Sequence, residues 1–295
     1  MSNSKSVPTY KRQRLLLAVA EKLPEPATAT DFQKIMFLCM MQTGRTDYEF
    51  VPYRFGPYSF QLAADIDTLR RTGFLPDGTH KIKAARNGFD FGSEVDIRIS
   101  IPNERGDALM RKVYSAYPFY TVNSEILQRL FNHEPTEMER LRAERQHLKQ
   151  TEKVLFTVGY EGRSLEAFIN ILLQNDIRVL CDVRKNPLSR KYGFSADKLE
   201  QVTQGAKIRY APFPGLGIDS DKRKSLDSID DYNNLFADYK QTLSFRAKEL
   251  ERLHRVFEEE GRIALMCFEK DPAMCHRSII RDYLCSKYDI RSADL

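Results

Sequence analysis

The sequence of 295 residues lacks any apolar run close to the roughly 20 residues that a membrane-spanning helix requires. Its polar start also lacks the apolar core of a signal peptide, so we expect a cytoplasmic protein with no membrane contact. No internal repeat or low-complexity segment is present. The five cysteines are an odd number and none belongs to a CxxC pair, which argues against a disulfide framework and against a cysteine-rich zinc module. We therefore expect free thiols.

The composition is that of a folded, soluble protein, with 42% hydrophobic and 29% charged residues. The length favours two domains, each large enough to bury its own core. The net charge of +5 permits a nucleic-acid partner but does not require one, and most of the basic excess lies before residue 151.

The first half of the chain predicts a small winged-helix-like α+β domain over residues 1–132. Apolar residues recur at helical spacing over 11–22, after Thr30 and after Ser59, and both of these residues suit helix N-caps. Two segments with strand character follow at 81–91 and 95–101, completing the three helices and hairpin of a winged helix. Residues 133–152 are charged nearly all round and predict a helical linker.

The second half, residues 153–295, alternates short apolar strands with helices. Strands are expected at 154–158, up to Val183, at 207–213 and at 263–268. Apolar strands joined by helices predict an α/β fold, a three-layer sandwich in which helices cover both faces of a mostly parallel sheet. The carboxyl ends of parallel strands form the edge at which α/β proteins bind their ligands.

A polar segment follows the last expected strand, at residues 267–277. We expect Asp271 to cap the closing helix and to place Cys275, His276 and Arg277 in its first turn, where free N–H groups stabilise negative charge. This pattern favours a Cys275 nucleophile of low pKa beside His276, or a phosphate held by Arg277. The alternative is a capped helix with a buried cysteine and a solvated arginine.

A second polar segment, residues 181–189, follows the strand that ends at Val183. Asp182 and Arg184 alternate with Val183, so they point to one side and can form an ion pair that positions a ligand. Ser189 and the basic residues around it add groups that bind anions. The alternative is a structural salt bridge that anchors the turn after the strand.

The glycine-containing segment 159–164 lies between a strand and a helix, as phosphate-binding loops do. It matches neither GxGxxG nor GxxxxGK[ST]. In one interpretation its glycines serve only the turn, and Glu161 lies on the surface. In the other interpretation Glu161 joins Asp182 and Glu269 at the sheet edge. Three carboxylates there would allow divalent-metal binding or general acid–base catalysis.

Other common centres find less support in the sequence. Cys267, Cys275 and His276 offer three soft ligands, but their spacing matches no standard zinc pattern, so a divalent metal remains only a minority expectation. No GxSxG motif is present to indicate a Ser-His-Asp triad.

Several of these segments together resemble the domain-of-unknown-function 488 family. The matching features, over about 154–284, are 157–164, Asp182-Val183-Arg184 with Pro187 and Ser189, Gly193-Phe194-Ser195, Pro214-Gly215-Leu216-Gly217, and Cys267-Phe268-Glu269 through Cys275-His276-Arg277. The resemblance implies an α/β sandwich with these polar segments at one edge. It implies no established reaction.

The first half is loosely similar to winged-helix-like modules, among them antitoxin-type domains. The similar residues are the helix 32–38 and the aromatic turn 55–58. If the similarity holds, the helix after Ser59 and the hairpin that follows would contact duplex phosphates through their basic residues. Because acidic residues are interspersed there and winged helices also bind proteins, a protein-contact role stays open.

We therefore expect a bacterial protein that processes a nucleotide or nucleic acid by hydrolysis or base modification, in phage defence or the control of mobile DNA by analogy. A non-catalytic sensor of a nucleotide-like ligand that regulates transcription is the alternative. The candidate catalytic residues are Glu161, Asp182, Glu269, Cys275 and His276. The candidate phosphate-binding residues are Tyr160, Arg163, Arg184, Ser189 and Arg277. The candidate nucleic-acid contacts are Arg70, Arg71, Lys81, Lys83 and Arg86.

Overall fold

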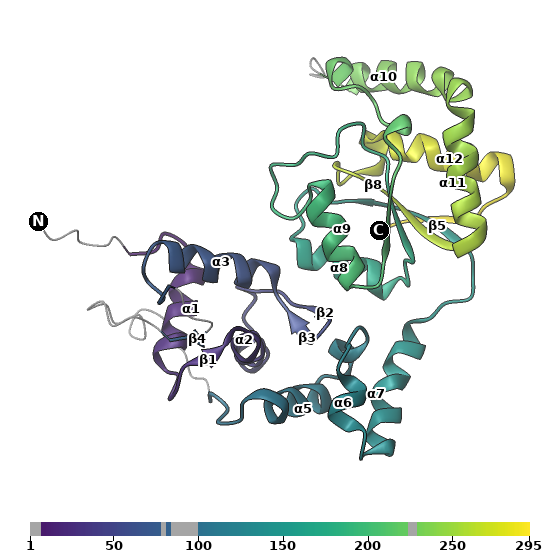
Figure 1. Ribbon diagram of the computed structural model, residues 1–295. Helices are drawn as coiled ribbons and strands as arrows, with labels where there is room; N and C mark the ends of the chain where they lie inside the picture. The colour runs from purple at the N-terminus through teal and green to yellow at the C-terminus, as the bar shows by residue number, and fades with distance from the viewer. Residues whose placement is uncertain (1–6, 78–80, 84–99, 224–228) are drawn as a thin grey trace, which may run out of the picture. The chain divides into compact units, whose positions relative to one another are not determined.

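The computed structural model of the protein describes residues 7–77, 81–83, 100–223 and 229–295 (Figure 1). The chain divides into two units, Met1–Gln146 and His147–Leu295. A separate cluster of buried apolar side chains lies in each unit, so each has its own core.

Unit 1 is mainly helical. Its helices are α1 (Lys11–Glu21), α2 (Ala29–Thr43), α3 (Phe60–Arg71), α5 (Gly106–Ala116), α6 (Leu127–Phe131) and α7 (Pro135–Leu148). Its strands form two antiparallel pairs, β1 (Ala27–Thr28) with β4 (Lys81–Ile82) and β2 (Val51–Tyr53) with β3 (Gly56–Tyr58). Ser59 caps α3 as predicted, since its side chain accepts the Leu62 amide at 3.1 Å.

The start of α2 differs from the prediction. The cap is Thr28 instead of Thr30, because the Thr28 hydroxyl accepts the Asp31 amide at 3.0 Å and donates to the Asp31 carboxylate at 2.8 Å. This reciprocal pair satisfies two groups at once, which a cap at Thr30 would not do.

The predicted hairpin and the predicted linker of unit 1 have different outcomes. The expected hairpin strands 81–91 and 95–101 lie mostly outside the described residues, so the winged-helix architecture stays a prediction. Residues 133–152 contain α7, which buries Leu141 in the core of unit 1. Arg140 of α7 also donates to the Ser115 carbonyl at 2.9 Å.

Lys34 is a buried cation in α2. Its side chain is 1% exposed, and its ammonium donates to the Pro57 carbonyl at 3.2 Å. Burial lowers the pKa of Lys34 to about 7, although Asp31 nearby opposes the shift. A buried lysine without a carboxylate in direct contact destabilises the folded state when it is protonated.

Replacement of Lys34 by Met should change how stability depends on pH. Between about pH 7 and 10.5 the folded state releases the Lys34 proton while the unfolded state keeps it, so the wild type should gain stability as the pH rises. The gain is up to about 1.4 kcal/mol per pH unit, and the Lys34→Met variant should lack it. The difference in the free energy of urea unfolding between the two full-length chains, measured across this pH range, checks the prediction. A difference that does not vary with pH would contradict it.

Unit 2 contains a five-stranded parallel sheet in the order β7-β6-β8-β5-β9. The strands are β5 (Val154–Gly159), β6 (Val179–Asp182), β7 (Arg209–Pro212), β8 (Arg262–Cys267) and β9 (Ser292–Asp294). All residues of β5, β6 and β8 are buried, as apolar central strands require. The parallel sheet confirms the predicted α/β class.

Helices cover both faces of this sheet, as Figure 1 shows. They are α8 (Leu165–Gln174) and α9 (Ala196–Gly205) on one face, and α10 (Ile229–Thr242), α11 (Ala247–Glu260) and α12 (His276–Tyr288) on the other. Ser164 caps α8, since its side chain accepts the Ala167 amide at 2.9 Å. The chain leaving β8 thus enters a helix on one face, while the neighbouring strands β5 and β6 lead to helices on the other. Diverging loops of this kind open a crevice at the carboxyl edge of a sheet.

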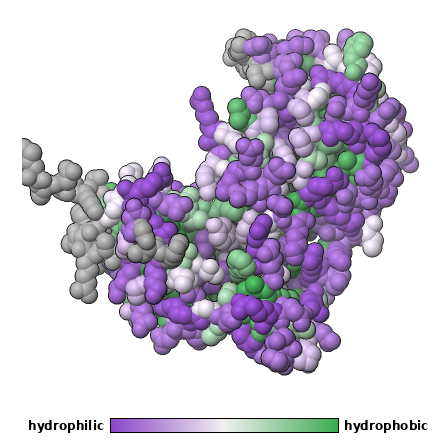
Figure 2. All heavy atoms as spheres, in the orientation of Figure 1, coloured by the Kyte–Doolittle hydropathy of each residue, from purple (hydrophilic) through white to green (hydrophobic). Residues whose placement is uncertain are grey.

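The face of the molecule in Figure 2 is mostly hydrophilic, with apolar atoms in small separate areas. No helix among the described residues has both the length and the apolar character needed to cross a membrane.

Candidate functional site

A cavity of about 650 Å³ opens at the carboxyl edge of the sheet in unit 2. Its lining comes from three segments: Tyr160 after β5, residues 184–191 after β6, and Cys267, Phe268, Glu269 and His276 after β8, with Ile218 beside them. These segments meet because β5, β8 and β6 are adjacent and parallel. The structure therefore brings these distant polar segments together at one edge of the sheet, as the sequence predicts.

Asp182 and Arg184 form a buried ion pair at the end of β6. The guanidinium donates to both carboxylate oxygens, at 2.8 Å from Nε and 2.6 Å from Nη2. Tyr210 of β7 also donates to the Asp182 carboxylate at 2.6 Å, which raises the pKa of Tyr210 together with burial. Asp182 is 1% exposed and does not line the cavity, and its carboxylate contacts Arg184 and Tyr210, so its catalytic role stays a prediction.

The rest of the Arg184 guanidinium fixes one wall of the cavity. Its Nη1 donates to the Tyr160 hydroxyl at 3.0 Å and to the Phe194 carbonyl at 2.9 Å. The Tyr160 ring in turn stacks on Phe194, with ring centroids 4.3 Å apart. A guanidinium held this way supports the wall of the cavity, and Asp182 balances its charge.

Arg277 holds the segment that carries Glu269. Its guanidinium donates to the carbonyls of Glu269 and Lys270 and, at 3.2 Å, to the Thr157 hydroxyl. The same segment lies against Gly159, where an added Cβ would be 1.9 Å from the Glu269 carbonyl oxygen. Only glycine permits this approach. Arg277 is 1% exposed and does not line the cavity, and its contacts hold this segment in place; its role as a phosphate ligand stays a prediction.

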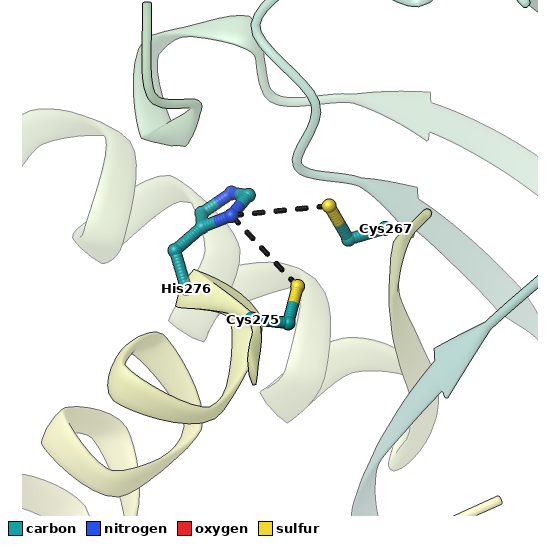
Figure 3. A group of neighbouring side chains, drawn as sticks. All are labelled: Cys267, Cys275 and His276. Carbon is teal, nitrogen blue, oxygen red and sulfur yellow. Dashed lines mark hydrogen bonds between the residues drawn. The ribbon is translucent and has the colours of Figure 1, made fainter. Parts of the chain in front are cut away.

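At the base of the cavity His276 faces two thiols, as Figure 3 shows. Its Nδ1 lies 3.8 Å from the sulfur of Cys267 and 3.9 Å from that of Cys275. Cys267 also donates to the Glu269 carboxylate at 3.2 Å. Cys267, Glu269 and His276 line the cavity, whereas Cys275 lies behind them.

The local structure around Cys275 differs from the sequence expectation. Asp271 accepts the Ala273 amide at 2.8 Å and caps a short 3₁₀ turn, Pro272–Met274, instead of α12. Cys275 is extended, with φ −142° and ψ 137°, and is itself the N-cap position of α12. The helix therefore begins at His276, one turn later than a cap at Asp271 would give.

The two thiols titrate as a coupled pair. Burial alone would raise the pKa of Cys275, but hydrogen bonds with Cys267 and His276 and the charges of His276 and Arg277 outweigh it, so the pKa of Cys275 lies well below its usual value. The hydrogen bond with Cys275, burial and Glu269 together raise the pKa of Cys267. The opposite directions of the two shifts make Cys275 the more acidic of the two thiols.

Basic and apolar side chains alternate along the rim. Lys185, Arg190 and Lys191 line the cavity, and the Lys191 ammonium also donates to the Tyr160 carbonyl at 2.7 Å. Leu188 and Phe268 line it too, although 76% and 42% of their surfaces are exposed. A rim with positive charge beside exposed apolar surface suits an anionic ligand that has an aromatic part.

This C-terminal geometry coincides with a known sequence family. Residues 164–284 match the model of "Domain of unknown function DUF488". The match confirms the resemblance inferred from the sequence. The chain has no match among the curated proteins or the solved structures.

The predicted site residues of unit 2 fall into three groups. Tyr160, Arg184, Ser189, Glu269 and His276 line the cavity. Asp182, Cys275 and Arg277 are buried behind its walls. Glu161 and Arg163 lie outside the lining: the Glu161 carboxylate accepts the Lys270 amide at 2.9 Å, and burial and the neighbouring Arg277 lower the pKa of Arg163.

Several residues that line the cavity were not among the predicted site residues, among them Cys267, Lys185, Arg190 and Lys191. Cys267 was considered only as a metal ligand, although its place at the end of a buried strand is the signal that would have put it at the edge. Lys185 and Arg190 lie in the loop after β6, where the basic cluster was noted but not assigned to the lining.

The cationic residues predicted in unit 1 do not share one environment. Arg71, Lys81 and Lys83 are exposed, while Arg86 lies outside the described residues. Arg70 lines a separate cavity of about 360 Å³ together with Lys34, Arg54, Tyr53 and Tyr58. Arg70 is thus partly buried, and the phosphate-contact hypothesis stays a prediction for all of these residues.

Proposed function

We propose that unit 2 binds a nucleotide, or a phosphate-bearing end of a nucleic acid, in the cavity at the carboxyl edge of its sheet and hydrolyses or modifies it there. The observation that carries this proposal is the single cavity lined by Lys185, Arg190 and Lys191 at the rim and by Cys267, Glu269 and His276 at the base.

The rim supports the phosphate part of the proposal. Lys185 pairs with Asp219 at 3.4 Å, and both side chains are about half exposed, so the pair costs little to exchange for a phosphate contact. Arg190 is exposed beside it. The Arg184 guanidinium also lines the cavity, with its charge paired to the Asp182 carboxylate.

The apolar part of the rim supports recognition of a base. Phe268 meets Tyr160 edge to face, with ring centroids 5.3 Å apart, and keeps 42% of its surface exposed. Leu188, in the loop after β6, also lines the cavity. Stacking of a base on such a surface contributes about 1–3 kcal/mol without requiring a particular sequence.

The base of the cavity supplies the groups for proton transfer. Glu269 and His276 both line it, and each touches the Cys267 thiol. A carboxylate and an imidazole within reach of one ligand can move protons in hydrolysis. In this account unit 1 brings nucleic acid or a protein partner to unit 2, with Arg71, Lys81 and Lys83 as its exposed cations.

Charge reversal at the rim tests the proposal. We expect Arg190→Glu and Lys185→Glu to weaken binding of nucleoside triphosphates and short single-stranded oligonucleotides by about 10-fold or more, since each change replaces attraction to phosphate by repulsion. Fluorescence anisotropy at fixed ionic strength measures the affinity. Arg255→Glu is the matched control, because Arg255 is exposed on α11 and does not line the cavity.

The outcomes separate the candidate functions. Rim variants that bind as tightly as the control would contradict the proposed ligand. Binding that depends on the rim without turnover of any compound in the panel would instead indicate a ligand sensor.

A further inference from the structure

Cys267, Cys275 and His276 present three soft donor atoms to one point in unit 2. One ligand atom from each lies within 4.8 Å of the other two, and all three residues are buried. Figure 3 shows that they come from two elements, the end of β8 and the start of α12, with the imidazole ring edge facing both sulfurs. Among the residues that the structure describes, this is the group of Cys, His, Asp and Glu side chains with the spacing of a metal site.

The hydrogen bonding of His276 prepares Nδ1 to act as a ligand. Its Nε2 lies 3.0 Å from the Val183 carbonyl oxygen. Since a carbonyl only accepts, Nε2 carries a proton, so Nδ1 is the nitrogen whose lone pair faces the thiols when the imidazole is neutral. A histidine that binds a metal through one nitrogen typically donates from the other to a carbonyl or carboxylate, which fixes its tautomer and orientation.

The distances match those of a tetrahedral site. Bond lengths of about 2.3 Å to sulfur and 2.0–2.1 Å to nitrogen at tetrahedral angles separate the nitrogen from each sulfur by about 3.6 Å. The separations here are 3.8 and 3.9 Å. A shift of a few tenths of an ångström would therefore complete the coordination.

We propose that Cys267, Cys275 and His276 bind one zinc-class cation whose fourth coordination position faces the cavity. Cys267 and His276 line that cavity, which gives water or a ligand access to the fourth position. Binding releases the thiol protons to solvent, and two thiolates then neutralise the dication. Glu269 lies beside Cys267 at 3.2 Å, within reach of a metal-bound water as a proton acceptor.

The metal site deepens the proposed function without depending on it. Binding of the cation follows from the three side chains alone. When bound, the cation would lower the pKa of its water and so supply a nucleophile for hydrolysis. In that step His276 would serve as a ligand and Glu269 alone would accept the proton, and this part of the inference rests on the proposed function.

Cobalt spectroscopy on the full-length protein tests the site directly. We expect Co²⁺ added to metal-free protein to give the intense visible bands of tetrahedral cobalt and a near-ultraviolet thiolate-to-cobalt absorption, saturating at a single equivalent and lost when Zn²⁺ displaces the cobalt. A folded wild-type chain that gives neither the tetrahedral bands nor the thiolate absorption would overturn the proposal. A redox pair would give a different result: the intact mass would show the loss of two hydrogens, and the reduced protein would give no cobalt bands. That result would overturn the metal proposal in favour of a disulfide between Cys267 and Cys275.

Variants assign the ligands. Loss of an outer-shell partner already costs about 10- to 100-fold in metal affinity, so Cys267→Ser and Cys275→Ser should each lower the zinc affinity by about 100-fold or more. Cys285→Ser is the matched control, since Cys285 lies on α12 outside the cluster. Equal zinc affinity in all three variants would contradict the assignment. Cobalt binding without nucleotide binding would support the metal site and contradict the proposed function. Nucleotide binding without cobalt binding would support the proposed function and contradict the metal site.

Discussion

Replacement of Asp182 by Asn should destabilise unit 2 by about 3–5 kcal/mol, because it leaves the Arg184 guanidinium buried without its carboxylate. The Asp182 and Arg184 side chains are 1% and 6% exposed, so water cannot take the place of the lost charge. Asparagine can accept from Arg184 only weakly, and it removes the charged acceptor of the Tyr210 hydroxyl. The free energy of urea unfolding of the full-length chain measures the effect.

An exposed ion pair provides the control for this prediction. Lys153 and Glu258 pair at 2.8 Å with about half of each side chain exposed, so Glu258→Gln should cost at most about 1 kcal/mol. An equally small cost for Asp182→Asn would show that the buried pair does not hold the fold. Unchanged stability combined with lost turnover would return Asp182 to the catalytic role first considered for it.

Replacement of Glu269 by Gln should reduce turnover by about 10²- to 10⁴-fold while nucleotide affinity changes little. Glutamine keeps the size of the side chain and its place on the loop that Arg277 and Gly159 fix, but it cannot accept a proton. Initial rates over a panel of nucleotides and oligonucleotides, analysed as kcat and KM, measure the effect.

The matched control for Glu269 is Glu251→Gln on the exposed surface of α11, which should leave both constants unchanged. A Glu269→Gln variant with full kcat would remove Glu269 from the reaction. A variant with unchanged kcat and a much higher KM would reassign Glu269 to ligand binding.

Much of unit 2 could be predicted from the sequence because its strands are short, continuously apolar and separated by amphipathic helices. β5, β6, β7 and β8 lie where the pattern indicates them. β9 was missed, because Ser292–Asp294 has no apolar run and pairs only at the sheet edge with β5. Such a strand is defined by its neighbour and leaves no periodic signal of its own.

The direction of individual side chains was harder to predict than the elements. Alternation along β6 and β8 sends Asp182 and Cys267 to opposite faces of the sheet, since Asp182 pairs in register with Met266. The sequence indicates this alternation but not which face borders the cavity. Arg277 likewise points inward, where its guanidinium donates to the carbonyls of Glu269 and Lys270. These carbonyls need a donor only once the loop has folded, so the sequence does not indicate this direction.

Helix starts show the same limit. Ser59 caps the helix predicted for it, because it is the only capping residue next to a clear apolar pattern. At α2 and α12 two capping residues or an intervening 3₁₀ turn compete, and the geometry of the loop decides between them.

The proposed function requires that unit 2 binds its ligand in the cavity at the carboxyl edge of the sheet. Crystals of the full-length protein soaked with a nucleoside triphosphate test it most directly. We predict electron density for phosphate against Lys185 and Arg190, with the base on Phe268. Density for the nucleotide elsewhere on the protein, with this cavity holding solvent alone, would contradict the claim.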